Sequence, residues 1–195
     1  MQPVSMRLKI YANNLGKVTS KDCIPIFHKW IQEKRFAETL IDVADYSHVH
    51  DGPGVMLIAH EADYALNFTE GRLGLEYTRK RAFPETFQKL LQQCFFQAVT
   101  ACCSLEDEPA MKNRITFFPG DCSLQLRDRL LAANMPATRD ALKKELLSFF
   151  SAFSWLANPD GFVEIAEPKK LVGYYLQINQ GLSLKMAKEQ LVKNN

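Results

Sequence analysis

The sequence predicts an α+β fold, in which a mainly antiparallel sheet of hairpins carries helices packed on one face. Runs of alternating apolar and polar residues, separated by turn-forming residues, recur along the chain and are typical of such hairpins. Between them lie longer segments whose apolar residues have helical spacing. The content of 47% hydrophobic and 24% charged residues is that of an ordinary globular protein.

The first half of the chain is expected to form a strand, a helix and three further strands. Asp22 is a suitable N-cap for the helix, and residues 51–54 (Asp-Gly-Pro-Gly) form a turn between the second and third strands. The expected elements cover residues 6–12, 22–36, 40–50, 55–68 and 73–80. In the last hairpin the alternation places an apolar face on the core and a polar face toward water. The apolar face holds Tyr64, Leu66, Phe68, Leu73, Leu75 and Tyr77, and the polar face holds Asp63, Asn67, Glu76 and Thr78.

The second half is expected to contain three helices and one more hairpin. A helix runs from Pro84 to about Cys103, with proline in the first turn, where its missing N–H costs nothing. The remaining elements are a helix from Pro136, a hairpin within 163–176 and a terminal helix from about Ser183. The 195 residues are assigned to a single domain, and the polar segment 105–113 is the place for any subdivision.

A weak internal similarity raises the question of a hairpin–helix repeat. The segment around 68–75 resembles that around 118–126, and each is followed by a helix that opens with proline and threonine. A period of about 50 residues is known for repeat proteins. A hairpin followed by a helix is also common in α+β proteins, so duplication and coincidence both stay open.

Charge and apolar segments argue against two classes of partner. The net charge of +2 is too balanced for a nucleic-acid protein recognised by charge alone. The N-terminus lacks a signal pattern, and the most apolar run, Leu146–Leu156, is too short to span a bilayer. We therefore expect a cytoplasmic protein with no membrane partner, whose self-association stays open. The five cysteines form no CxxC pair, which predicts reduced thiols, and Cys122, expected in a turn, is the candidate for reactivity.

Three of the four histidines lie within residues 45–61, among carboxylates. Strand parity puts Asp45 beside His60 if the connection at 51–54 has an even number of residues. Asp45 would then orient His60 as a general base with Glu61 nearby, and these three are the candidate catalytic residues. Because the shared face is otherwise apolar, a buried acid–histidine pair that only fixes strand register is the alternative.

His48 and His50 share the other face of the expected strand. Two histidines so spaced are candidate ligands for a divalent metal, with Asp42 or Asp63 supplying oxygen. A divalent metal is the one cofactor that the pattern suggests. The alternative is a pair of exposed histidines beside a turn, since a metal site requires further ligands.

Arg72 and Arg79 flank the strand expected at 73–80. Together with His48 and His50 they are the candidate ligand-binding residues, because cations at a strand end can hold an anionic group. Charged residues that protect an exposed strand end are the alternative. The sequence has no P-loop, dinucleotide-binding, zinc-protease or serine-hydrolase motif, which weakens those enzyme classes.

The segment Asp45–Tyr64, read DYSHVHDGPGVMLIAHEADY, resembles a stretch found in a family of uncharacterised bacterial proteins. That resemblance covers about a tenth of the chain and implies no activity. The strand–helix–strand–strand order at 6–68 resembles small-molecule-binding modules of the transcription-regulator effector type, a likeness of fold alone.

Three functions follow from these observations. The first is binding of a small polar or anionic ligand, with or without a metal, near the 45–61 hairpin. The second is a hydrolase or isomerase in which an Asp–His pair transfers a proton. The third is a non-catalytic interaction module that uses a sheet edge or the terminal helix. The helix residues in question are Leu182, Leu184, Met186 and Leu191.

Overall fold

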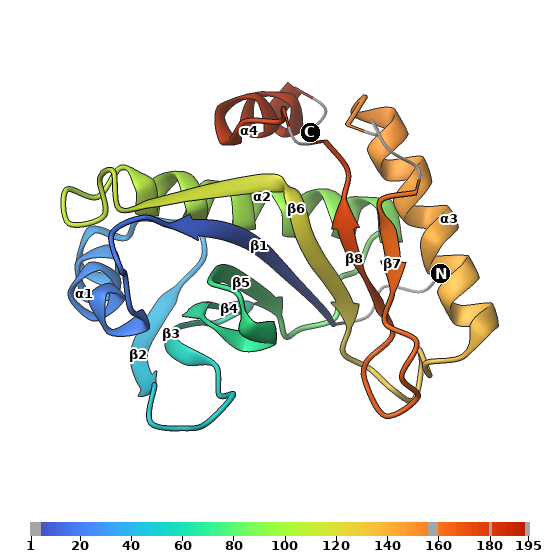
Figure 1. The fold of residues 1–195 in the computed structure, drawn as a ribbon, viewed down its shortest axis with the longest axis horizontal. Helices are drawn as coiled ribbons and strands as arrows, with labels where there is room; N and C mark the ends of the chain where they lie inside the picture. The colour runs from blue at the N-terminus through green and yellow to red at the C-terminus, as the bar shows by residue number, and fades with distance from the viewer. Residues whose placement is uncertain (1–4, 156–159, 180, 194–195) are drawn as a thin grey trace.

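One antiparallel sheet of eight strands organises the computed structural model, which describes residues 5–155, 160–179 and 181–193. The strands lie in the order β2-β3-β4-β5-β1-β6-β8-β7 (Figure 1). They are β1 (Met6–Asn14), β2 (Leu40–Tyr46), β3 (Gly54–Ala59), β4 (Ala62–Asn67), β5 (Gly74–Arg79), β6 (Ile115–Leu126), β7 (Phe162–Glu164) and β8 (Gly173–Gln177). The helices are α1 (Cys23–Glu33), α2 (Phe87–Glu106), α3 (Pro136–Ala152) and α4 (Leu184–Lys193), and 3-10 turns cover Ser20–Asp22 and Thr69–Gly71. The predicted α+β class and antiparallel sheet are confirmed.

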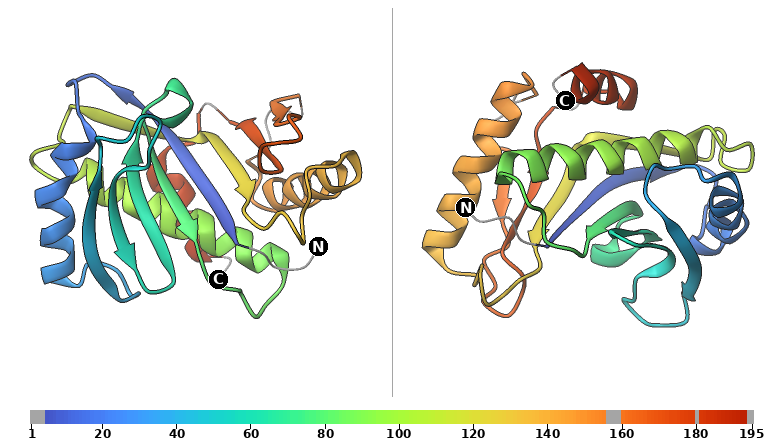
Figure 2. Two further views of the ribbon diagram at one scale, coloured as in Figure 1. Left: turned by 90° about the horizontal axis from the view of Figure 1, so that it is seen from below. Right: turned by 180° about the vertical axis from the view of Figure 1, so that it is seen from behind.

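The apolar face of the sheet packs against α2, which contacts β5, β1 and β6. α4 in turn contacts α2 and β6. Burial of apolar side chains between these layers is the main driving force for such an arrangement. Viewed from below, the strands lie in front of α2 and α4, so these helices leave the opposite face of the sheet uncovered, and we call it the open face (Figure 2, left). This open face carries the candidate site.

Several predicted boundaries were wrong for local reasons. The strand expected at 40–50 ends at Tyr46, where Asp45 Oδ1 accepts a hydrogen bond from the Ser47 N–H at 2.8 Å and starts a turn. The segment 55–68 is two strands, β3 and β4, joined by a turn at residues 60–61. α2 begins three residues after Pro84, because Thr86 is its N-cap and accepts from the Lys89 N–H.

The second half of the proposed repeat also differs. The expected turn near 119–122 is part of the continuous strand β6, so Cys122 lies in a strand and is buried. β6 pairs with β1, and one sheet therefore includes strands from both sides of the 105–113 segment. Two predictions fall partly outside the described residues. They are the absence of a signal pattern, which concerns residues 1–4, and the apolar run that ends at Leu156.

A buried carboxylate fixes α1 to the end of α2. Glu108 accepts a hydrogen bond from Trp30 Nε1 at 2.8 Å and one from Lys29 Nζ at 2.9 Å, and it is 6% exposed. Burial acts to raise the pKa of Glu108, but the hydrogen bonds from Lys29 and Trp30 prevail and hold it below its usual range. The ionised carboxylate is therefore the form that stabilises the folded state.

The substitution Glu108→Gln is expected to lower the free energy of unfolding at pH 7 by about 1–2 kcal/mol. Because the folded-state pKa is depressed, this contribution is present above the carboxyl's ordinary pKa and is lost as the pH falls through the folded value. Urea unfolding of both proteins at pH 7 and at about pH 3 measures it. A difference that stays constant across that range would contradict the role of the charge.

Candidate functional site

The predicted contact between Asp45 and His60 is wrong. Asp45 is exposed and lies opposite Val55, whereas His60 follows the last residue of β3. At about 3.3 Å per residue, the five steps from Val55 to His60 amount to about 16 Å along the strand. The connection between β2 and β3 covers residues 47–53, an odd number, and a register shift at 40–42 breaks the assumed parity further.

His48 and His50 lie in the connection between β2 and β3 rather than on a strand, so the shared strand face predicted for them is wrong. Both are exposed, and Nδ1 of His50 is 3.2 Å from Asp51 Oδ2. In the described residues, no three His, Cys, Asp or Glu side chains come together as ligands for a metal ion. The geometry thus supplies no third ligand to the histidine pair within that part of the chain.

His60, Glu61 and Arg79 do come together at the turn between β3 and β4. His60 Nδ1 is 2.9 Å from Glu61 Oε1, and Arg79 Nη2 donates to Glu61 Oε2 at 3.0 Å. The Arg79 guanidinium also donates to Gln93 Oε1 on α2 at 3.1 Å. This group ties the hairpin turn to β5 and α2, while His60 itself is exposed. Its geometry fits a structural ion-pair cluster, and its catalytic role stays a prediction.

The open face of the sheet, by contrast, is lined with polar side chains that are largely buried. Alternation along the strands puts them opposite one another in register. One row across β5, β1, β6 and β8 holds Glu76, Lys9, Ser123 and Tyr175, and the next holds Thr78, Arg7 and Gln125. Asn67, Glu76 and Thr78 lie on the predicted face of the sheet, away from the apolar core. The prediction that this face contacts water was wrong for them, because all three are buried. Polar groups with so little solvent need partners within the protein.

Lys9 in the centre of this face anchors the turn at Thr69–Gly71. Its ammonium donates to Thr69 O at 2.6 Å, Thr69 Oγ1 at 2.9 Å and Arg72 O at 2.9 Å, and the residue is 1% exposed. Burial lowers the pKa of Lys9 to about 8. Gly74 leaves room for the Lys9 side chain to reach the turn, because a Cβ at position 74 would lie 2.7 Å from Lys9 Cε. With all three donors used, Lys9 positions the turn and is not available to a ligand.

The anchored turn presents Glu70 and Arg72 to a cavity of about 290 Å³ on the open sheet face, here called the sheet-face cleft. Glu70 adopts a left-handed conformation with φ of 65°, which is unusual for a residue with a side chain. Its carboxylate accepts from Tyr11 OH at 2.5 Å and lies 3.5 Å from Tyr175 OH. Arg72 lies over the Tyr11 ring at 3.9 Å and pairs with Asp121 through both terminal nitrogens. Acidic, hydroxyl and aromatic groups thus converge on one cavity.

The charges of the sheet-face cleft are unequal. Three carboxylates, from Glu70, Asp121 and Asp160, line it together with one guanidinium, that of Arg72. The hydrogen bond from Arg72 to Asp121 raises the pKa of Arg72. Burial, and then the neighbouring Glu70, raises the pKa of Tyr11 and of Tyr175, so both phenols are neutral donors at physiological pH. An adjoining cavity of about 270 Å³ shares Asp121 and Gln177 and extends the cleft along β6 and β8.

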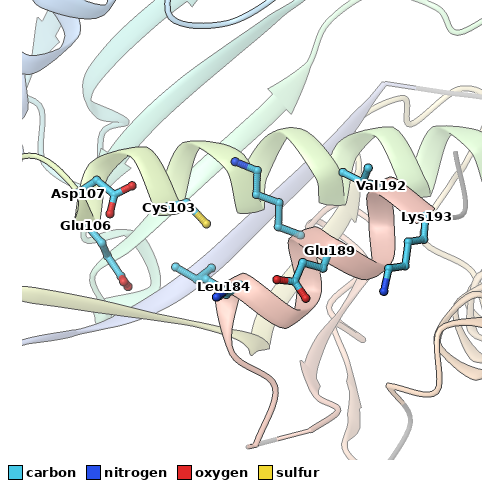
Figure 3. Close-up of a pocket in the computed structure, with 9 residues that line it drawn as sticks. Cys103, Glu106, Asp107, Leu184, Glu189, Val192 and Lys193 are labelled. Carbon is cyan, nitrogen blue, oxygen red and sulfur yellow. The ribbon is translucent and has the colours of Figure 1, made fainter.

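A larger cavity, of about 620 Å³, lies between α2 and α4 (Figure 3). Cys103 lies on the side of α2 that faces α4, and Glu106 and Asp107 lie at the end of α2. Leu184 and Val192 of α4 make the opposite wall apolar, and lysines of α4 border it. Burial raises the pKa of the Cys103 thiol. No residue that lines this groove carries a hydroxyl group or a positive φ, and Glu106 already accepts a hydrogen bond from the Phe117 N–H at 2.6 Å. We therefore take the sheet-face cleft as the candidate site.

Most of the apolar residues predicted to mediate contact through the terminal helix are buried instead. Leu182, Leu184 and Leu191 are buried in the core, and only Met186 of the four predicted interaction residues is exposed. All five cysteines are free, and burial raises the pKa of Cys122, so its predicted reactivity is not supported. No helix in the described part of the chain has the length and apolarity needed to cross a membrane.

No model of a known protein family matches the chain, and no curated protein matches it either. The resemblance of the 45–64 segment to bacterial proteins therefore stays an expectation. We therefore infer the function from the geometry of the site.

Proposed function

We propose that the protein binds a small polar ligand in the sheet-face cleft. The observation that carries this proposal is the convergence of Tyr11, Glu70, Arg72, Asp121 and Tyr175 on one cavity. Small-molecule sites are typically concave and combine apolar surface with a few oriented polar groups. The cavity is near the lower end of the volume range of such sites, about 300–1,000 Å³, and the adjoining cavity extends it.

The chemistry of the lining favours a ligand that offers hydrogen-bond donors. Carboxylates outnumber guanidinium groups, and the one guanidinium already pairs with Asp121. An anionic ligand would have to displace Asp121 from Arg72 and approach Glu70, which like-charge repulsion disfavours. A ligand with amine and hydroxyl groups meets free acceptor positions on Glu70 and Asp121. Of the polar and anionic ligands predicted from the sequence, we therefore propose the polar one, and we place it on the open sheet face rather than at the 45–61 hairpin.

The substitution Glu70→Gly is expected to remove a ligand-binding group while the protein still folds. Glycine suits the left-handed φ of 65° at this position, and this gain offsets the lost hydrogen bond from the Tyr11 OH, so the turn is expected to form with a melting temperature close to that of the wild type. Loss of the carboxylate removes the central acceptor, and binding of an amino sugar is expected to weaken at least about tenfold, as loss of a charge-assisted hydrogen bond implies.

Thermal unfolding with glucosamine, glucose and citrate as probes tests this proposal, because a ligand that binds only the folded state raises its stability. Glucosamine should stabilise the wild type and Lys34→Gly, a control at another positive φ, but not Glu70→Gly. Equal stabilisation of Glu70→Gly, or stabilisation of the wild type by citrate alone, would contradict the proposal.

A further inference from the structure

The segment between β6 and α3 exposes a cluster of apolar side chains. Leu130 is 96% exposed, Leu131 65% and Met135 57%. Single exposed apolar residues are common on protein surfaces, but several together at one place indicate a contact surface. The cluster shares no residue with the sheet-face cleft and belongs to none of the sites described above.

The apolar cluster is held in a defined conformation. Asp128 Oδ1 accepts hydrogen bonds from the N–H groups of Leu130 at 2.9 Å and Leu131 at 3.1 Å. Ala132 N–H closes the turn by donating to Asp128 O at 2.8 Å. Both leucines are therefore directed outward by a hydrogen-bonded turn rather than left exposed at the end of an open loop.

A second loop supports the first. Asn134 Nδ2 donates to Ile165 O at 2.8 Å and to Glu167 O at 2.9 Å, and Arg129 donates to Lys169 O. The loops 127–135 and 165–172 thus form one unit, here called the two-loop tip. Figure 1 shows both loops side by side at the same end of the molecule, below α3 and the β7–β8 hairpin.

The two loops of the two-loop tip also carry exposed cations. Arg127, Arg129, Lys169 and Lys170 are all exposed. The two carboxylates of the same loops are engaged, because Asp128 caps the turn and Glu167 pairs with Lys170 at 2.7 Å. The tip therefore combines outward apolar side chains with an excess of positive charge.

We propose that the two-loop tip docks on an anionic lipid surface. Apolar side chains that enter the interface and cations that contact acidic headgroups are the two contributions that hold peripheral proteins on membranes. Charge complementarity selects an anionic surface, and the outward leucines select one whose interior is apolar. Such docking needs no membrane-spanning helix, and it revises the expectation of no membrane partner.

Co-sedimentation with phosphatidylcholine vesicles, with and without phosphatidylglycerol, tests the docking. The wild type should bind the anionic vesicles, bind neutral ones much less, and dissociate as salt is raised. The double variant Leu130→Ser/Leu131→Ser should bind at least about tenfold more weakly, because it removes two side chains that would enter the apolar interior of the lipid surface. Lys169→Glu should weaken binding to anionic vesicles only.

Leu15→Ser is the matched control, because Leu15 is an exposed leucine outside the two-loop tip. Circular dichroism shows whether each variant is folded. Absence of wild-type binding to anionic vesicles would overturn the proposal, as would equal loss in Leu15→Ser. Concentration-dependent self-association that the double variant abolishes, without any vesicle binding, would instead assign the tip to a protein contact and also overturn it.

Discussion

Replacing Lys9 with Met is expected to lower the free energy of unfolding by about 3 kcal/mol. Methionine keeps the apolar stem that lies over Gly74, but it offers nothing to Thr69 O and Arg72 O, which lose their donor inside the protein. These hydrogen bonds are part-buried, so each carbonyl left without a partner costs at most about 1–3 kcal/mol, and removing the buried ammonium offsets part of that loss.

Urea or thermal unfolding measures the effect, which corresponds to a fall in melting temperature of about 6–12 °C for a chain of this size. Lys89→Met is the control, since Lys89 is exposed. Because the Thr69–Gly71 turn carries Glu70, Lys9→Met should also weaken binding of glucosamine. A Lys9→Met protein as stable as the control would show that the ammonium does not hold the turn.

Replacing Arg79 with Leu is expected to lower the free energy of unfolding by about 2–3 kcal/mol, the second large effect. The Arg79 side chain is 7% exposed and donates to Glu61, Gln93 and Arg81 O. Loss of a buried partner is costly, but Glu61 is 36% exposed and can be rehydrated, which reduces the expected cost.

Arg81→Leu is a suitable comparison, because Arg81 is exposed and donates one hydrogen bond, to His60 O at 3.1 Å. We expect that variant to lie within about 0.5 kcal/mol of the wild type. Hydrogen exchange at the β3–β4 turn should accelerate much more in Arg79→Leu than in Arg81→Leu, which loses one exposed hydrogen bond to the turn. Equal stability of the two variants would mean that the His60–Glu61–Arg79 cluster does not fix the turn.

The hydrophobic pattern was sufficient for the fold class and for most elements. Tyr64, Leu66, Leu75 and Tyr77 are buried as the alternation predicts, and the β7–β8 hairpin lies where it was expected. Periodicity reports which face of an element is apolar, and burial of that face decides the fold. It does not report where a short strand ends, so the turns at 47 and at 60–61 were missed.

The candidate site was harder to predict for a physical reason. Histidines and carboxylates close together in sequence drew attention to residues 45–61, but strand register separates Asp45 from His60. The sheet-face cleft joins Tyr11, Glu70, Asp121 and Tyr175 from four distant segments, and only tertiary pairing brings them together. Arg72 was predicted because it is charged and flanks a strand. A signal that was present but unused is Lys9, a lysine inside an apolar strand, which indicates a buried polar partner.

The binding of a polar ligand on the open face of the sheet can be tested directly by NMR titration of the wild-type protein with glucosamine. The account predicts saturable changes in the amide signals of Tyr11, Glu70, Asp121 and Tyr175, and no comparable changes with citrate. Changes confined to the 45–61 hairpin or to the groove between α2 and α4, or no saturable change at all, would contradict it.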